Sequence, residues 1–278
     1  MRLGGPTFGR HSGPDGWLAE LRELGYGAAY CPIEADADDA TVRAYERAAR
    51  EAGVVIAEVG AWSNPLSPDD DERAKALAHC RRQLALAERI GARCCVNIAG
   101  SRGREWHGHD PANFADETFD MIVEVVRGII DDVRPRRAFY TLEPMPWMYP
   151  DSPDEYVRLI EAVDRDCFAA HLDPVNIVAS PRLYYTNAAL LRECFAKLGP
   201  AIRSCHAKDI ALRQAFTVHL DEVRPGLGGL DYRTFLAELD RLDPDVTLMM
   251  EHLPDAGEYA LAAEHIRSVA REVGVALR

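Results

Sequence analysis

The 278-residue chain lacks a CxxC pair, a long apolar run and an excess of basic charge. Its seven cysteines are odd in number and lie mostly in apolar runs, where cysteine behaves as a small buried hydrophobe, so we predict a reduced, cytoplasmic protein. No stretch approaches the roughly 18 apolar residues that cross a bilayer, and residues 1–16 contain no apolar segment of signal-peptide length. We therefore expect neither targeting nor membrane anchoring.

Basic side chains are outnumbered: 32 Lys and Arg stand against 45 Asp and Glu, a net charge of −13. Such a chain has no general positive field to attract phosphate backbones or anionic lipids, which disfavours a nucleic-acid-binding or membrane-surface protein. The content of 47% hydrophobic and 28% charged residues is typical of a globular protein. We expect its partner to be a small molecule.

Short apolar runs alternate with longer segments of helical periodicity about eight times along the chain. The predicted strands lie near 2–5, 26–31, 54–59, 93–98, 138–143, 167–173, 201–206 and 246–251. The predicted helices lie near 15–24, 39–52, 69–90, 114–131, 153–164, 187–198, 231–241 and 257–273. Ser67, Ser152 and Asn187 are candidate N-terminal caps, and glycines 25, 53, 91 and 199 are candidate left-handed helix ends.

The apolar runs are hydrophobic at both odd and even positions, which is typical of parallel strands covered on both faces. Eight strand–helix units most simply close into one α/β (β/α)8 TIM barrel, a single domain over residues 1–278. An open doubly wound sheet would carry a GxGxxG turn after an early strand, and the sequence has none. The late segment PGLGGLDY at 225–232 is either a flexible turn or a phosphate site at the following helix.

Four polar residues end apolar runs in four successive units: Glu143, Asp173, His206 and Glu251. Active sites of such barrels form at the carboxyl ends of the strands, and adjacent strands lie only ~4.8 Å apart. The four side chains are therefore predicted to converge on one divalent cation. Three carboxylates and one imidazole suit Mn²⁺, Mg²⁺ or Co²⁺ better than a thiolate-preferring metal, with Zn²⁺ as an alternative.

The segments TLEP, HLDPVN, CHAKD and MMEH, in this order and spacing, resemble the metal-binding segments of the xylose isomerase-like TIM-barrel superfamily. That superfamily includes sugar-phosphate isomerases and epimerases, ketose 3-epimerases and inosose dehydratases. The resemblance implies one divalent metal, with Mn²⁺ expected first, held by Glu143, Asp173, His206 and Glu251. It further implies that Glu143 and Glu251 exchange a substrate proton from opposite faces of a sugar. A homodimer or homotetramer is expected by the same analogy.

Two positions depart from the ketose epimerase pattern. Asn176 stands where those enzymes have a substrate-binding His, and Arg213 lies one position beyond their substrate Arg. Both remain candidate substrate ligands here. Lys208 shares the face of His206 and is a candidate acid or oxyanion ligand, or else an ion-pair partner of Asp209 or another acid.

Further candidate substrate-binding residues come from strand parity and loop position. His171 lies one layer below Asp173, where a core role competes with ligand binding. Glu58 and Trp62 end the third strand. The loop 101–111 carries Trp106 and His107 between arginines and a second histidine, which favours gripping a sugar ring, carboxylate or phosphate, or else plain solvation.

These residues predict a metal-dependent isomerase or epimerase acting on a small sugar, sugar phosphate or polyol-derived ketone through an enediolate. The alternative is a dehydratase of the inosose dehydratase type, with the same metal stabilising an enolate. A remote alternative is an endonuclease IV-like phosphodiesterase, which the acidic charge disfavours.

Overall fold

The computed structural model describes residues 1–278, and eight of its strands form a closed parallel barrel in the order β1-β10-β7-β6-β5-β4-β3-β2. The barrel strands are β1 Arg2–Gly5, β2 Ala28–Tyr30, β3 Val55–Gly60, β4 Cys94–Asn97, β5 Phe139–Leu142, β6 Phe168–Leu172, β7 Ile202–Ala207 and β10 Thr247–Met250. Each agrees with a predicted strand to within two residues at either end. The chain therefore folds as the predicted (β/α)8 barrel.

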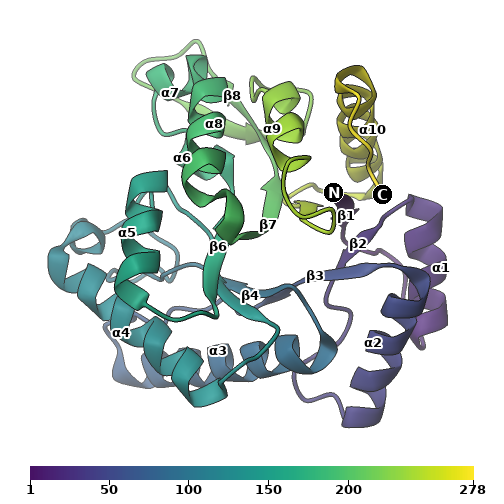
Figure 1. Cartoon of the computed structure of the whole chain (residues 1–278). Coiled ribbons are helices and arrows are strands. Elements are labelled where there is room, and N and C mark those ends of the chain that lie inside the picture. Colours follow the sequence, from purple (N-terminus) through teal and green to yellow (C-terminus); the bar gives the residue numbers. More distant parts are fainter.

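Eight longer helices surround the barrel (Figure 1). They are α1 Pro14–Leu24, α2 Asp39–Ala52, α3 Asp70–Ile90, α4 Asp116–Val133, α5 Pro153–Val163, α8 Asn187–Leu198, α9 Tyr232–Leu239 and α10 Ala256–Val273. Both faces of each barrel strand are covered, which explains the continuous apolar runs. None of these helices has the length and apolarity to span a membrane.

The helix ends follow the predicted signals with three exceptions. Gly25, Gly53 and Gly91 are left-handed as predicted, but Gly199 is right-handed at φ −40° because the chain continues into the 3₁₀ turn η2 Gly199–Ala201. Ser152 caps α5, whereas Asp69 rather than Ser67 caps α3. The side chain of Asn187 does not cap α8; it donates to the carbonyls of Tyr184 and Gly229.

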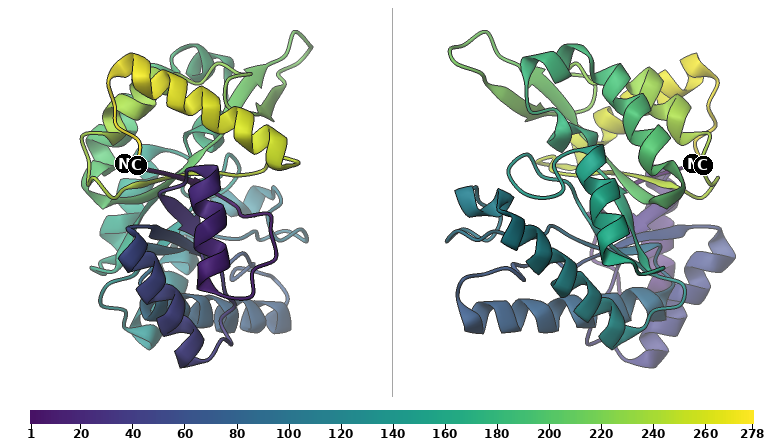
Figure 2. Two further views of the ribbon diagram at one scale, coloured as in Figure 1. Left: turned by 90° about the vertical axis from the view of Figure 1, so that its right-hand side faces the viewer. Right: turned by 60° about the vertical axis from the view of Figure 1, so that its left-hand side comes forward.

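The sequence did not predict the antiparallel hairpin of β8 Asp209–Leu212 and β9 Leu220–Val223 after the seventh barrel strand. It projects from the barrel (Figure 2). Short helical turns also follow barrel strands, namely η1 Pro111–Phe114, α6 Pro174–Ile177 and α7 Pro181–Tyr185. The hairpin matters for function because its second strand reaches back over the carboxyl end of the barrel.

The two chain ends lie beside each other at the opposite end of the barrel (Figure 1). The amide of Leu3 donates to the carbonyl of Arg278, and the amide of Arg278 donates to that of Met1. Between the two barrel ends, 66 buried apolar residues form one continuous core. The strand ends that carry Glu143, Asp173, His206 and Glu251 are thus mounted on a rigid frame.

Candidate metal centre and active site

The four predicted metal ligands gather at the carboxyl end of the barrel, and their ligand atoms all lie within 4.8 Å of one another. Nδ1 of His206 is 2.8 Å from Glu251 Oε1, 3.3 Å from Glu143 Oε1 and 3.7 Å from Asp173 Oδ2. His206 and Asp173 are fully buried, and the other two are nearly so. The fold therefore brings these four side chains to one point.

Local structure explains how each side chain is aimed. Glu143 and Glu251 directly follow β5 and β10, while His206 lies within β7. Asp173 follows β6 and caps the short helix α6, where one of its oxygens accepts from the amides of Val175 and Asn176. Its other oxygen, Oδ2, is thereby left facing the cluster.

Lys208 lies at the centre of the cluster and is only 2% exposed. Its ammonium is 2.7 Å from Glu251 Oε1, 2.8 Å from Asp173 Oδ2 and 3.3 Å from Glu143 Oε1. Of the predicted ion-pair partners, Asp209 or another acid, Lys208 thus pairs with these three other acids. Asp209 instead accepts from the amides of the 225–230 turn, including Gly226 and Gly228.

The hydrogen bonds of Asp209 decide between the two interpretations of the glycine-rich segment 225–232. The amides that a phosphate would need are taken by an internal carboxylate, and Asp231 caps the following helix α9. The structure therefore fits a turn in PGLGGLDY better than a phosphate site.

A second group of buried polar residues supports His206 from below. Oε2 of Glu58 is 3.3 Å from Nε2 of His206, and its Oε1 is 3.0 Å from Nε2 of His171. The hydroxyl of Ser204 donates to the same carboxylate and accepts from Thr247. A carboxylate on Nε2 fixes the imidazole orientation and directs Nδ1 toward the four-residue cluster.

The cluster strongly favours positive charge at its centre. Burial opposes ionisation, yet the charges of His206 and Lys208 lower the pKa of Glu251 to about 2. Burial likewise opposes charge on His206, but Glu251, Glu143 and Glu58 raise its pKa well above the usual value. The carboxylates overcome the burial of Lys208 in the same way and raise its pKa too.

The residues present fit a hard divalent cation. Oδ2 of Asp173 and Oε1 of Glu251 are buried and contact the Lys208 ammonium and the His206 imidazole, so two carboxylate oxygens face the same point. Oxygen donors with one imidazole are the ligands that Mn²⁺, Mg²⁺ and Co²⁺ accept. Three carboxylates, one ammonium and a divalent cation together would be neutral.

A cavity of about 680 Å³ opens above the cluster and is suited to a small ligand. Glu143, Glu251, Lys208 and Asn176 form its polar side. The remaining lining residues are largely aromatic or apolar: Tyr30, Trp62, Ile98, Trp106, His107, Met145, Trp147, Glu222 and His252. Aromatic faces beside carboxylates are typical of sites that bind a polar ring.

Most of the predicted substrate-binding residues line this cavity. Trp62, Trp106 and His107 do, and so does Asn176, whose amide also donates to Glu143 Oε1 at 2.9 Å. The expectation of direct substrate contact is corrected for Glu58 and His171. Both lie beneath the cluster and are buried away from the cavity, so a ligand there does not reach them.

Arg213 does not reach the cavity. It is on the outer part of the hairpin, 62% exposed and paired with Asp221. The unpredicted hairpin is the physical reason, since it carries the chain away from the barrel end directly after Asp209. Neither His107 nor His109, the second histidine of the loop 101–111, lies in a group of side chains that could hold a metal ion.

Sequence reasoning missed Tyr30, Trp147, Glu222 and His252 as cavity residues. Glu222 comes from β9 and is 3.2 Å from the imidazole of His252, which has a positive φ of 59°. The indole of Trp147 donates to the carbonyl of His107. Tyr30 alone carried a usable signal, because it ends a barrel strand.

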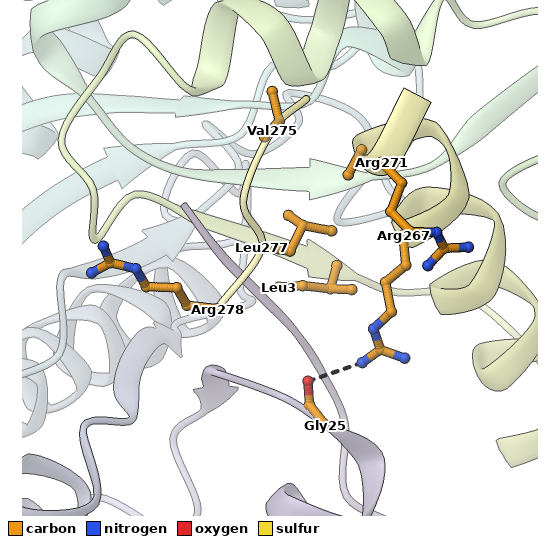
Figure 3. A pocket seen from close by; sticks show the side chains of 8 residues that line it. Leu3, Gly25, Arg267, Arg271, Val275, Leu277 and Arg278 are labelled. Carbon is orange, nitrogen blue, oxygen red and sulfur yellow. Dashed lines mark hydrogen bonds between the residues drawn. The ribbon is translucent and has the colours of Figure 1, made fainter. Parts of the chain in front are cut away.

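Another hollow lies at the opposite end of the barrel, beside Leu3 and Leu277 (Figure 3). It has about 240 Å³ and contains three arginines, but no carboxylate side chain, imidazole or thiol lines it. Arg267 donates to the Gly25 carbonyl, while Arg278 extends away from it (Figure 3). This hollow has no groups suited to acid–base chemistry.

Solved structures similar to this chain share the fold at low identity. A xylose isomerase-like TIM barrel protein from Mycobacterium smegmatis in complex with magnesium is 20% identical, with a TM-score of 0.67 over 98% of this chain and 96% of that one. D-psicose 3-epimerase with D-tagatose from Clostridium cellulolyticum H10 is 15% identical, with a TM-score of 0.69 over 99% and 100%. Endonuclease IV from Thermus thermophilus is 18% identical, with a TM-score of 0.71 over 98% and 100%.

At 20% identity or less, their likeness shows the fold and leaves the reaction to the residues of this site. No curated protein matches the sequence. The model of the family described as xylose isomerase-like TIM barrel matches residues 18–269. The match spans the barrel from α1 to α10 and includes all four clustered ligands, so the chain belongs to the xylose isomerase-like TIM barrel family.

Proposed function

We propose that the protein is a divalent-metal-dependent isomerase or epimerase of a small sugar, sugar phosphate or polyol-derived ketone. The observation that carries this proposal is the pair Glu143 and Glu251. They come from β5 and β10, with β6 and β7 between them in the barrel, and both line the cavity. A ligand in the cavity would therefore have a carboxylate on each side.

Proton exchange beside a carbonyl needs a base on the face from which the proton leaves and an acid on the face to which it returns. We assign these two roles to Glu143 and Glu251, which both line the cavity. Asn176 donates to Glu143 and holds its carboxylate in place. Lys208 lies within 3.3 Å of both carboxylates and is a ready donor to the oxygen that becomes negative as an enediolate forms.

A divalent cation held by Glu143, Asp173, His206 and Glu251 would supply Lewis-acid polarisation of the substrate carbonyl and hydroxyl oxygens. We propose Mn²⁺ first, with Mg²⁺, Co²⁺ and Zn²⁺ as alternatives, because the donor set is mainly carboxylate. The chain's own part is to neutralise charge and to exclude water. The aromatic side chains Tyr30, Trp62, Trp106 and Trp147 do the latter around the cavity.

The test is solvent exchange. The purified protein, with Mn²⁺ added, is incubated in heavy water with a panel of ketoses and ketose phosphates, and deuterium uptake is followed by mass spectrometry. We expect Glu143→Gln and Glu251→Gln each to lower the exchange rate by ~10²-fold or more. His206→Ala should also lower the bound metal measured by elemental analysis.

Glu272→Gln is the matched control, because Glu272 lies on the outer helix α10 and pairs with Arg233 at the surface. It should behave like the unmodified protein. Full exchange and full metal content in the three site variants would contradict the proposal.

Dehydration is the second candidate, favoured by one observation: the buried ammonium of Lys208 is a hydrogen-bond donor close to the cavity floor. Such a donor suits the expulsion of hydroxide. The same mass spectra separate the two reactions, since dehydration removes one water from the product whereas isomerisation only exchanges hydrogen for deuterium.

Phosphodiester cleavage is disfavoured by the charge of the site. Carboxylates dominate the cluster and the cavity above it, in a chain of net charge −13. A nucleic-acid backbone would be repelled there. With all seven cysteines free, we further propose that the protein works in the reducing cytoplasm.

A further inference from the structure

A second hollow, of about 700 Å³, lies next to the candidate active-site cavity and shares two of its walls, Trp62 and Trp106. Apart from Ala76, its other lining residues are polar or charged, and they come from α3 and from the loops after β3 and β4. The two hollows therefore meet at a pair of indoles. A ligand longer than one sugar ring would extend from the first into the second past these indoles.

The second hollow is basic although the protein is acidic. Lys75, Arg82 and Arg104 line it, against the single carboxylate of Glu72. Glu72 is paired with Lys75 at 2.7 Å, whereas Arg82 and Arg104 have no ion-pair or hydrogen-bond partner. Two unpaired guanidiniums beside one cavity are suited to an oxyanion.

Helix geometry explains why α3 contributes basic side chains to the second hollow. Lys75, His79 and Arg82 are spaced four and three residues apart on α3, so they lie on one face of that helix. The buried face of the same helix, which includes Cys80, Leu84 and Ala87, packs on the barrel. The basic face is left directed toward the hollow.

The β4–α4 loop supplies Arg104 and Trp106, and it is anchored at its base. The buried side chain of Asn64 exchanges hydrogen bonds with Ser101, at 2.9 and 3.0 Å. Asn113 accepts from the Arg102 amide and donates to the carbonyls of Gly108 and Trp147. A loop fixed in this way loses little conformational entropy when a ligand binds.

We propose that this hollow binds an oxyanion carried by the substrate, a phosphate ester or a carboxylate, at the end remote from the reacting carbonyl. The inference rests on the proposed function, since it assigns a substrate class to the same site. It narrows the candidate substrates to anionic sugars and sugar acids. Arg82 and Arg104 are its specificity-determining residues.

The first experiment measures anion binding without turnover. Inorganic phosphate, tartrate and glucose are titrated against the protein by calorimetry, with tryptophan fluorescence as a second readout because Trp62 and Trp106 line the hollow. We expect binding of at least one anion and none of glucose at equal concentration. Tighter binding of phosphate than tartrate assigns a phosphate ester, and the reverse order assigns a carboxylate.

The variants locate the binding. Arg82→Gln combined with Arg104→Gln should weaken anion binding at least tenfold, because each guanidinium provides charge-assisted hydrogen bonds. Arg233→Gln, an exposed arginine on α9 that pairs with Glu272, should leave binding unchanged. Equal anion binding by the double variant and the unmodified protein, or no anion binding at all, would overturn the proposal.

The two proposals fail separately. Glu143→Gln should abolish deuterium exchange yet keep anion binding, because Glu143 lines only the first cavity. If anion binding depends on the two arginines but the protein exchanges deuterium into no ketose, the anion site is supported and the proposed reaction is contradicted. In an active protein, the double variant should lower the preference for phosphorylated or carboxylated over neutral ketoses at least tenfold.

Discussion

Among single residues, the buried charged side chains around His206 are stable only because they neutralise one another. Glu58, Asp173 and His206 are fully or almost fully buried, and each would be strongly destabilising alone. They form a chain in which Glu58 holds His206 from below while Asp173, Glu143 and Glu251 face its other nitrogen. His206 is thus positioned by a residue outside the four-residue cluster, Glu58, which contacts the ring nitrogen that faces away from the other three ligands.

This arrangement predicts the effect of Glu58→Gln. The amide keeps the size of the carboxylate but removes the charge on Nε2 of His206, and such outer partners typically contribute 10–100-fold to metal affinity. We expect Mn²⁺ to bind roughly 10–100-fold more weakly by calorimetry. The ¹⁵N shifts of the His206 imidazole should report a changed tautomer, which a purely structural role would not produce.

Glu238→Gln is a suitable comparison, because Glu238 of α9 lies outside the site and pairs only with the exposed Arg241. Unchanged Mn²⁺ affinity in Glu58→Gln, with unchanged imidazole shifts, would show that Glu58 does not position His206.

Among the strands and helices, two glycines should respond in opposite ways to alanine. A Cβ on Gly4 of β1 would overlap the carbonyl of Ala28 on the paired strand β2. Gly128 lies within α4, and a Cβ there meets nothing within 4 Å. We expect Gly4→Ala to lower the free energy of unfolding by ~1–3 kcal/mol and Gly128→Ala to raise it by ~0.5–1 kcal/mol.

Urea denaturation followed by circular dichroism measures both changes. Each variant is the control for the other, since the substitution is the same and only the surroundings of the glycine differ. A Gly4→Ala variant as stable as the unmodified protein would mean that strand pairing at β1 is looser than the structure shows, and a destabilised Gly128→Ala variant would contradict the open surroundings of Gly128.

Another feature that links two elements is the turn before β5, which is held by Glu88 at the end of α3. Its Oε2 accepts from the amides of Arg136, Arg137 and Ala138, each at 3.0 Å. Burial opposes ionisation, but these three amides lower the pKa of Glu88 below 4.5. A lowered pKa means that the charged form stabilises the fold above about pH 4.5, and this contribution is lost as the pH falls through the folded-state value.

Glu88→Gln should therefore lower the free energy of unfolding by about 1 kcal/mol at pH 7 and by less at pH 3. The effect is modest because the side chain is partly exposed to solvent. Denaturation curves at the two pH values measure it. Glu124→Gln on α4 is the control, and a cost for Glu88→Gln that does not shrink at pH 3 would contradict this account.

Across the molecule as a whole, the barrel encloses its thiols. All seven cysteines are free, and five are buried. Burial raises the pKa of every one of them, to about 11 for Cys31 and about 12 for Cys194. The thiolate form that reacts is scarce near neutral pH.

We expect a disulfide reagent to modify the folded protein slowly at pH 8 and to titrate all seven thiols only after denaturation. Absorbance of the released thiolate follows both phases. Rapid modification of several thiols in the folded protein would mean that the barrel opens far more readily than its single core suggests.

The repeat of eight strands and helices, most helix ends and the four clustered ligands could all be predicted from the order of the residues. Period, capping and a polar residue at the end of an apolar run are local properties, and a parallel barrel brings equivalent strand ends together without further instruction. Two features could not be predicted in this way: Glu58 supports His206 from across the barrel, and the hairpin carries Arg213 away from the cluster. They join residues that are far apart in the chain or separated by an unpredicted turn, and closure of the barrel rather than any local pattern sets them.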